Sequence, residues 1–355
     1  MRRAAAACIL LVTSLAWAAP ADVRARVRAL EELLDEEDYA AAHAELDRLQ
    51  KGQEKNESFD FFAGRVAFGE GRYADAVSAL ELAGVEDRPG SYLRLVRDTL
   101  AITRDHERSE SEHFIFLYPK GKDVVLAPYA LEALEAQRAA LEKDLGHAPP
   151  GKVRVEVVND AAELARVSTL SQKEIDQTGT IAICKFNKLM VTSPKAVLRG
   201  YDWLDTLAHE YTHLVVTQTG HNSVPIWLQE ALAKYLESRW RGPAGKALPP
   251  SSRTLLSERV QKNDLIPFAK MHPSMAKLPS AEDATLAFAE VENAIAYLYE
   301  KGGMAALRDA IKRVGDGEDA RLAVAAAAGG GWPEFERGWR AFMVAQHYKT
   351  FPAID

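Results

Sequence analysis

The chain has 355 residues, of which 47% are hydrophobic and 27% are charged, and this length accommodates one or two domains. The composition is typical of a globular protein and excludes an intrinsically disordered chain, which would contain far fewer apolar residues. The formal net charge is −7. Binding to nucleic-acid phosphates requires a basic surface, so we expect no nucleic-acid partner.

The N-terminus has the pattern of a secretory signal peptide. Residues 1–3 are basic after the initial methionine, residues 4–17 are apolar apart from two hydroxyl side chains, and residues 16–18 have the small-x-small form of a cleavage site. The apolar run is too short to cross ~30 Å of hydrocarbon. We predict cleavage after Ala18, a mature chain without a transmembrane segment, and a secreted or periplasmic location. The alternative is an uncleaved anchor.

Removal of the signal peptide would change both charge and cysteine content. Two arginines would be lost, leaving 42 basic against 51 acidic residues and a formal charge of −9. Cys8 would be lost as well, so that Cys184 remains alone and an intramolecular disulfide is excluded. Cys184 ends the apolar run that begins at Ile181. This position predicts a small buried side chain rather than a reactive thiol.

Residues 22–105 show apolar positions at helical spacing throughout. The segment also contains an internal repeat, because residues 38–46 match residues 72–80 after a shift of 34, which is the tetratricopeptide period. We therefore predict a tetratricopeptide-like helical domain over residues 19–105, whose concave surface would suit a protein partner. The alternative is a plain helical bundle with similar spacing.

The pattern changes after residues 105–112, which we interpret as a charged linker. Short alternating or apolar segments then precede a mostly helical C-terminal half, so we predict an α+β domain over residues 109–355. The strands expected are 113–118, 153–158, 180–184 and 188–192, and the helices are 126–145, 160–167 and several from 201 onward.

Residues 207–213 contain the motif H-E-x-x-H. On a helix, His209 and His213 lie on one face about 6 Å apart along the axis, so both imidazoles can reach one metal ion at about 2.0–2.1 Å. Glu210 is turned about 100° from His209, which places its carboxylate beside the metal as a proton acceptor. The alternative is a pair of histidines without a metal. A helix is expected because apolar residues recur at Trp203, Leu207, Tyr211 and Leu214.

A catalytic zinc site needs a third protein ligand. His221 does not fit the extended motif H-E-x-x-H-x-x-G-x-x-H, which would require glycine and histidine where this chain has Val216 and Thr219. Glu230 lies in a second helical segment, residues 225–235, and two antiparallel helices joined by a short loop would direct it back toward the histidines. The alternative for Glu230 is a solvated side chain on an amphipathic helix.

Residues 113–345 resemble the peptidase MA-like domains of the gluzincin group. The resemblance implies a zincin-type domain with a small sheet and a mostly helical C-terminal half. It also implies one zinc ion, bound by His209, His213 and Glu230, with Glu210 as general base. The segments that carry the resemblance are His113–Phe116, Thr206–His213, Pro225–Ala233, Tyr297–Leu298, Gly302–Leu307 and Trp332–Trp339.

The chain departs from the family pattern around the metal ligands. Some gluzincins carry an acidic residue four positions after the ligand glutamate, where it orients a histidine, but this chain has Lys234. Glu237 shares a helix face with the ligand glutamate and is the substitute candidate, with a surface role as the alternative. Phe288 stands where tyrosine is common in the family. Oxyanion stabilisation therefore stays unassigned, with Tyr297 and His221 as candidates.

The predicted function is that of an exported zinc metallopeptidase acting on a peptide or protein substrate. Zinc would activate water and polarise the scissile carbonyl, while Glu210 would carry the proton to the leaving amine. An extended substrate would pair with an edge strand within residues 179–192, unless this stretch is an internal hairpin.

A rival prediction is a tetratricopeptide-type binding or scaffold protein that carries a structural or inactive zinc site. The presence of Glu210 argues against it, because a structural site has no use for a base. A zinc hydrolase that does not act on peptides is a third interpretation that the ligands alone leave open.

Overall fold

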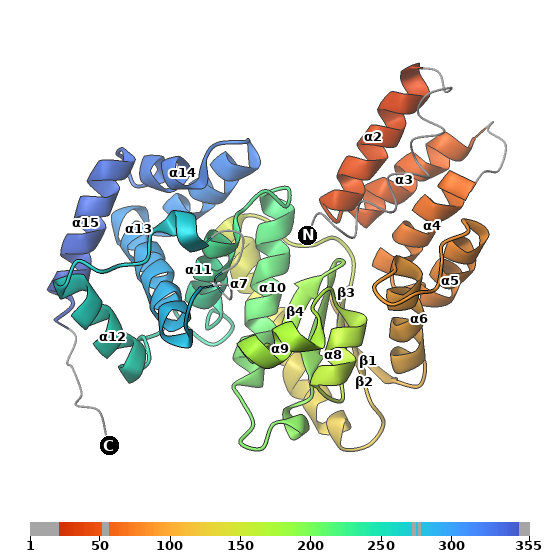
Figure 1. Ribbon diagram of the computed structural model, residues 1–355, viewed down its shortest axis with the longest axis horizontal. Helices are drawn as coiled ribbons and strands as arrows, with labels where there is room; N and C mark the ends of the chain where they lie inside the picture. Colours follow the sequence, from red (N-terminus) through yellow and green to blue (C-terminus); the bar gives the residue numbers. More distant parts are fainter. Residues whose placement is uncertain (1–20, 52–56, 272–274, 276–277, 348–355) are drawn as a thin grey trace. The chain divides into compact units, whose positions relative to one another are not determined.

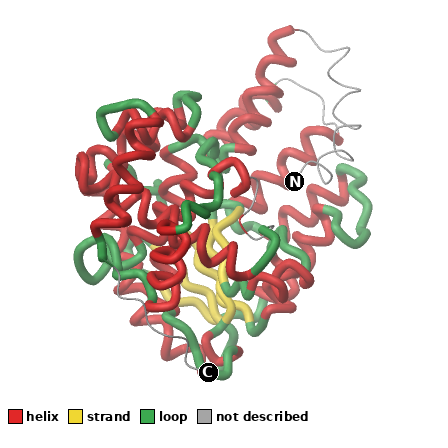
Figure 2. Tube along the Cα trace, turned by 60° about the vertical axis from the view of Figure 1, so that its left-hand side comes forward, coloured by secondary structure: helices red, strands yellow, loops and turns green. Residues whose placement is uncertain are grey.

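The computed structural model describes residues 21–51, 57–271, 275 and 278–347 (Figure 1). The predicted signal peptide, residues 1–18, lies outside the described residues and stays a prediction. Helices predominate, and the described strands form one small sheet, which confirms the α+β class (Figure 2). Among the described helices, none is both long and apolar enough to span a membrane.

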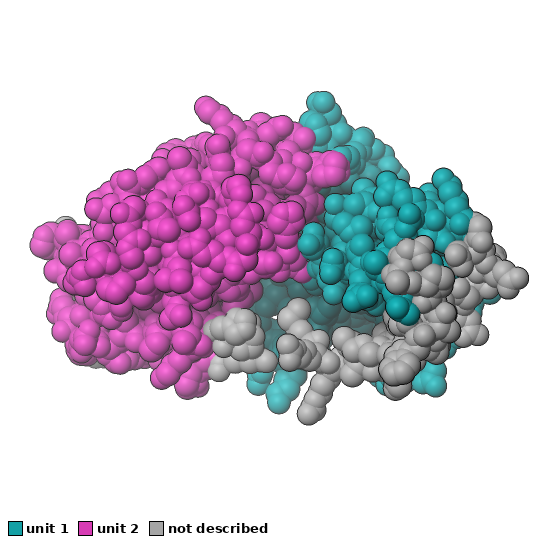
Figure 3. All heavy atoms as spheres, turned by 90° about the horizontal axis from the view of Figure 1, so that it is seen from above, with its two compact units in different colours: residues 1–128, 151–201 teal, residues 129–150, 202–355 magenta. Residues whose placement is uncertain are grey.

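The chain divides into two compact units (Figure 3). Unit 1 comprises residues 1–128 and 151–201, and unit 2 comprises residues 129–150 and 202–355. Compactness thus groups the N-terminal helices with the sheet. The predicted boundary at residues 105–109 separates the helical domain from the peptidase domain at the change from helix to strand. This boundary stays a proposal about domain organisation.

Unit 1 begins with consecutive helices that pack on their neighbours in chain order. They are α2 (Ala21–Asp35), α3 (Tyr39–Gln50), α4 (Glu57–Gly69), α5 (Tyr73–Leu82) and α6 (Tyr92–Thr103). Asp38 and Ser91 cap α3 and α6 by accepting hydrogen bonds from the first-turn N–H groups of Ala41 and Arg94. This helical region agrees with a repeat-like organisation, while its assignment to the tetratricopeptide type stays a prediction.

The predicted repeat is visible in burial as well as in sequence. Both copies place an aromatic side chain, a small side chain and a leucine inside at equivalent positions: Tyr39 and Tyr73, Ala42 and Ala76, Leu46 and Leu80. The same spacing therefore buries the same face in two successive helical hairpins.

The sheet of unit 1 has five strands in the order β1-β2-β3-β5-β4. Strands β2, β3 and β5 are parallel, and β1 and β4 pair antiparallel at the two edges. The elements of this part are β1 (Glu107–Glu110), β2 (Phe114–Tyr118), η1 (Lys122–Leu126), β3 (Val153–Val158), α8 (Ala161–Val167), α9 (Gln172–Thr178), β4 (Ala182–Lys185), β5 (Lys188–Thr192) and η2 (Pro194–Ala196). The four strands expected from the sequence are therefore present, and β4 is an edge strand.

Two local expectations need correction. Residues 107–110 are not a linker: they form β1, because the backbone of Phe114–Tyr118 offers a ladder to pair with and charged side chains suit an exposed edge strand. Cys184 lies on β4 and is half-buried rather than fully enclosed, since an edge strand has a neighbour on one side only.

Helices α4–α6 share one hydrophobic core with the sheet, while α2 and α3 pack with part of α4 in a second buried cluster. Phe68 of α4 and Leu93 of α6 belong to the same buried cluster as Val158 of β3 and Met190 of β5. Phe186, in the turn between β4 and β5, contacts Phe68 with ring centroids 5.0 Å apart. The face that these helices turn inward is therefore filled by the chain's own sheet.

A buried polar network crosses the same core. Lys188 of β5 donates to Glu156 of β3 at 2.8 Å and to the Tyr73 hydroxyl of α5 at 2.9 Å, and Tyr73 in turn donates to Glu156. Glu156 and Lys188 are 0% and 1% exposed. Burial alone would raise the pKa of Glu156, but Lys188 and Arg154 hold it below its ordinary value. The network thus joins a repeat helix to two strands.

Unit 2 consists of helices, which include both segments expected to carry metal ligands. They are α7 (Ala127–Leu145, whose first two residues belong to unit 1), α10 (Trp203–Thr219), α11 (Ile226–Leu236), α12 (Pro250–Gln261), η3 (Phe268–Met271), α13 (Ala281–Gly315, bent at Gly303), α14 (Ala320–Ala327) and α15 (Trp332–Ala345). Helices α10 and α11 pack on each other, and α13 packs against both.

The buried network of unit 1 predicts an unequal response to two lysine substitutions. Lys188→Met leaves the Glu156 charge buried with a weaker set of partners, so we expect the free energy of unfolding to fall by about 3 kcal/mol or more. Lys152→Met removes an exposed ion pair with Glu110, so it should lower the free energy of unfolding far less. Urea denaturation of both variants checks this, and equal losses would contradict the network's role.

Candidate metal centre

Helix α10 carries the two histidines, and its buried apolar side holds the helix in place. Leu207, Tyr211 and Leu214 are 0% exposed, which confirms the predicted core stripe at these positions, while Trp203 at its start is only half-buried. His209 and His213 lie one turn apart on another side and are half-buried. Their ring centroids are 4.7 Å apart, so the predicted i, i+4 proximity is present.

A tight turn brings α11 back along α10. α10 ends at Thr219 and is capped by Gly220, where a Cβ atom would collide with the side chain of Val224. His221 and Asn222 then adopt left-handed backbone conformations with φ of 49° and 51°, and the Asn222 N–H donates to the Thr217 carbonyl at 2.8 Å. The chain thereby reverses within a few residues, and α11 begins directly after Pro225.

The reversal brings three donor atoms together. The Nε2 atoms of His209 and His213 are 3.1 Å apart, and Glu230 Oε2 lies 3.5 Å from the first and 3.7 Å from the second. Within the described part of the chain, these three residues are the group of histidine, cysteine and acidic side chains that could hold a metal ion. The structure thus places together the residues that the sequence predicts as ligands.

The spacing of these atoms fits a small tetrahedral ion. Ligand atoms at about 2.0–2.1 Å from a tetrahedral centre are separated from one another by about 3.3–3.4 Å. The three distances observed, 3.1, 3.5 and 3.7 Å, lie on both sides of that value. Two imidazoles and one carboxylate also form the His₂Glu donor set of catalytic zinc sites, which leaves a fourth position for a reactant.

Each imidazole is oriented through its second nitrogen. Glu237 Oε2 lies 3.2 Å from Nδ1 of His209, and Gln229 Oε1 lies 3.2 Å from Nδ1 of His213. The Gln229 amide donates in turn to Thr217 at 3.2 Å. An acceptor at Nδ1 keeps the proton there and leaves Nε2 with its lone pair toward the centre, as a metal ligand requires.

The electrostatics of the cluster favour positive charge at its centre. Burial opposes protonation of His209, but Glu230 and Glu237 outweigh it and raise its pKa to about 10. Burial likewise opposes protonation of His213, and Glu230 raises its pKa above the ordinary value. Burial would raise the pKa of Glu230, yet the two histidines hold this pKa well below its usual range. A site that stabilises a proton this strongly also suits a divalent cation.

Glu210 lies beside the three donor atoms without joining them. Its residue is 7% exposed, and its charge contributes to the electrostatic environment of both histidines. As the residue after His209 on α10, it is rotated by about 100° around the helix axis. This position agrees with the predicted place of a base next to the ligand cluster.

A family model of the peptidase MA superfamily matches residues 133–345, more than half of the chain and including both ligand helices. This chain belongs to the peptidase MA superfamily. A comparison with curated proteins finds no match. The superfamily is typically zinc-dependent, which agrees with the His, His and Glu cluster.

The peptidase MA match covers most of the segments that carried the sequence resemblance. It includes Thr206–His213, Pro225–Ala233 and the three downstream segments. It begins within α7, so His113–Phe116 on and beside β2 lies before the matched residues. The start of the peptidase domain at residue 109 therefore stays a prediction.

The structure separates the remaining candidates by position. Glu237, the substitute for the acidic residue missing at Lys234, contacts His209. His221 lies on the turn after α10 and is outside the ligand group. Tyr297 packs its ring against Phe335 and Phe342 of α15, at centroid distances of 5.3 and 5.5 Å, as a core residue does. Phe288 is 38% exposed.

Two residues of this peptidase MA site were not predicted from the sequence. Gln229 is one, although its position directly before the ligand Glu230 could have indicated a contact with a ligand histidine. Gln137 of α7 is the other: its amide donates to Thr212 Oγ1 of α10 at 3.1 Å and to the Leu236 carbonyl at the end of α11 at 3.0 Å. Gln137 and Thr212 are both 0% exposed. This bridge ties the two ligand helices to a third helix.

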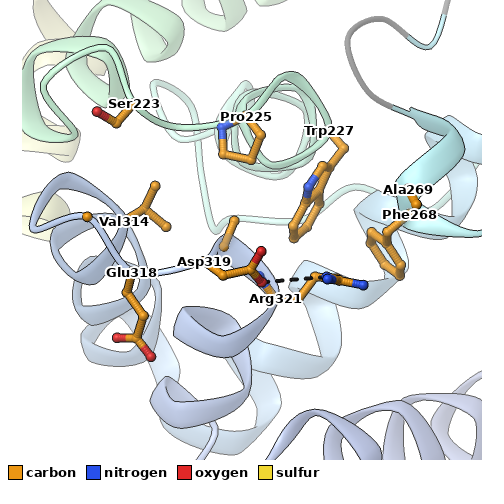
Figure 4. A pocket seen from close by; sticks show the side chains of 11 residues that line it. Ser223, Pro225, Trp227, Phe268, Ala269, Val314, Glu318, Asp319 and Arg321 are labelled. Carbon is orange, nitrogen blue, oxygen red and sulfur yellow. Dashed lines mark hydrogen bonds and ion pairs between the residues drawn. The ribbon is translucent and has the colours of Figure 1, made fainter.

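A separate cavity of about 400 Å³ lies near the start of α11 (Figure 4). Trp227 and Phe268 form an aromatic wall with ring centroids 4.7 Å apart, and Arg321 pairs with Asp319 at the rim. The three candidate ligands are not among the residues that line it. In this superfamily member, converging polar atoms rather than this cavity mark the candidate metal centre.

The centre predicts different effects for two histidine substitutions. His213→Ala removes one of three ligand atoms, whereas His221→Ala changes a histidine outside the group. Loss of an outer partner typically weakens metal affinity 10–100-fold, so loss of a ligand should weaken zinc affinity by more than about 100-fold. We expect zinc after dialysis to be lost from His213→Ala and retained by His221→Ala. The reverse pattern would make His221 a ligand in place of His213.

Proposed function

We propose that this protein is a zinc-dependent peptidase, in which His209, His213 and Glu230 hold the metal and Glu210 is the general base. The observation that supports this most is the convergence of three donor atoms beside a buried glutamate, within a domain of the peptidase MA superfamily. The substrate is proposed to be a peptide or protein, because the superfamily is one of peptidases.

A zinc ion bound at this centre would supply Lewis acidity to the scissile carbonyl group. The protein's own residues would supply the proton transfers. Glu210 would accept a proton from the attacking water and deliver it to the leaving nitrogen, since it is adjacent to the ligand cluster but is not a member of it. Glu237 and Gln229 would hold the two imidazoles in the tautomer that directs Nε2 inward.

Two further parts of the proposal rest on sequence. Export depends on the signal-peptide pattern of residues 1–18, and a substrate pairing with an edge strand depends on residues 179–192. β4 within that stretch lies at an edge of the sheet, so its outer backbone groups are not used by β5. An extended peptide could use such groups for main-chain hydrogen bonds.

The rival function is a scaffold that binds a protein partner through its helical repeats. Two observations weigh against it. The face of α4–α6 that joins the shared core is already covered by the sheet of the same unit. A structural metal site also has no chemical use for the buried Glu210. A zinc hydrolase acting on another substrate shares the same ligands, so the substrate itself must be tested.

Replacing the proposed base tests the mechanism. Glu210→Gln keeps the size of the side chain but cannot accept the proton, so we expect cleavage of a pool of denatured proteins to fall by at least about 10²–10⁴-fold, with zinc content unchanged. Glu258→Gln, an exposed position on α12, is the matched control and should retain activity.

Removal of zinc with a chelator completes this test. Zinc removal should abolish the activity of the wild type, and zinc addition should restore it. Full activity of Glu210→Gln would contradict the role of the base. A wild type that binds zinc but leaves every denatured protein intact would favour the scaffold or the non-peptidase hydrolase.

A further inference from the structure

The carboxylate that contacts His209 is itself surrounded by donors. Glu237 is 4% exposed, and in addition to His209 it accepts from Lys234 at 3.0 and 3.1 Å and from Lys246 at 3.2 Å. Lys234 lies three residues earlier in the chain, at the end of α11, and its side chain is 43% exposed. Lys246 comes from the irregular segment after α11 and reaches the carboxylate from a different element.

Lys246 makes a second contact, which leads back to α10. Its Nζ donates to Asp205 as well as to Glu237. Asp205 is 5% exposed and lies four residues before His209, one turn away on the same helix. Asp205 also accepts from Trp240 Nε1 at 2.9 Å and from Arg241 at 2.5 Å. A single ammonium group therefore joins two buried carboxylates, one on α10 and one at the C-terminal end of α11.

The backbone beside Lys246 is firmly held. The Gly245 N–H donates to the Tyr235 carbonyl of α11 at 2.7 Å. Gly245 has φ of +80°, and a Cβ atom there would lie 2.7 Å from the Tyr235 ring, so glycine is needed on both counts. Earlier in the same segment, Ser238 donates to the Pro243 carbonyl at 3.1 Å. Lys246 is therefore presented from a defined position rather than from a mobile loop.

We propose that Lys246 is a positioning residue for the metal centre, which joins Asp205 to Glu237 and so fixes the carboxylate that orients His209. The inference rests on the proposed function, because it takes the three donor atoms to be zinc ligands. A metal-bound histidine depends on its outer hydrogen-bond partner for ring orientation and basicity. Lys246 extends that dependence by one further residue.

Lys246 contributes more than Lys234 to the position of the Glu237 carboxylate, because only Lys246 also contacts Asp205 of α10. Lys234 reaches Glu237 along its own chain segment, so it adds charge to the carboxylate but does not tie it to α10. Lys246 lies between the carboxylates of Glu237 and the buried Asp205. Asp205 also accepts from Arg241, so positive and negative side chains alternate from Arg241 through Asp205 and Lys246 to Glu237. Removing Lys246 leaves Glu237 able to move relative to His209 while Lys234 still compensates its charge.

Zinc affinity of the purified protein, measured by competition with a chromophoric chelator, tests the proposal. Lys246→Met should weaken zinc binding about 10–100-fold, the range typical of lost outer partners. Lys312→Met is the matched control, because it removes an exposed lysine that pairs with Asp316 on the surface, and it should bind zinc as the wild type does. The melting temperature of each metal-free variant is recorded alongside.

A double-mutant cycle separates positioning from a merely structural role. In a Glu237→Gln background, Lys246→Met should change zinc affinity less than twofold, because Lys246 acts through Glu237. Asp205→Asn should follow the same pattern as Lys246→Met: it should weaken zinc binding when Glu237 is present and change it less than twofold in the Glu237→Gln background. It replaces Lys246→Met in the cycle if that variant does not fold. Equal losses with and without Glu237 would overturn the proposal.

The remaining outcomes distinguish this inference from the proposed function. If the wild type binds zinc and Lys246→Met binds it equally well, the positioning role is wrong while the metal centre stands. If the wild type does not bind zinc, the proposed function fails and the positioning role fails with it.

Discussion

Three electron-rich atoms from two helices converge within 3.7 Å of one another, and the architecture around them serves to hold this otherwise unfavourable arrangement. Two imidazole nitrogens and a carboxylate oxygen repel one another unless positive charge lies between them. The two histidines come together through the helical period, and the carboxylate depends on the sharp reversal at Gly220. The buried Gln137 amide then fixes the two helices against α7.

The elements whose cause is local were predictable from the sequence. The apolar stripe of α10, the short strands and the helix before Gly146 all follow from periodicity and turn residues. Prediction failed where an element depends on pairing with another segment or is very short. Residues 107–110 are charged and resemble a linker, yet they become β1 because the β2 backbone lies beside them. α9 was missed because it is short, although Ser171 and Glu174 form a capping box at its start.

The candidate site divides in the same way. His209, Glu210 and His213 follow from a motif, and Glu230 follows from the idea of a returning helix. The contact of Glu237 with His209 was predictable from helical periodicity, because Glu237 follows Glu230 by about two turns and shares its helix face. Lys246 was not, because it lies in an irregular segment whose path is set by the Gly245 to Tyr235 hydrogen bond and by Asp205. A side chain that acts through another residue from an irregular segment has no fixed spacing from the motif, so only the three-dimensional structure reveals it.

The identity of the atoms around the metal tests the central claim most directly. X-ray absorption at the zinc edge of the purified, zinc-loaded protein reports the number and type of ligands. We expect two imidazole nitrogens together with carboxylate or solvent oxygens at about 2.0–2.2 Å from the zinc of the wild type. A third imidazole, a sulfur ligand at about 2.3 Å, or the absence of bound zinc would contradict it.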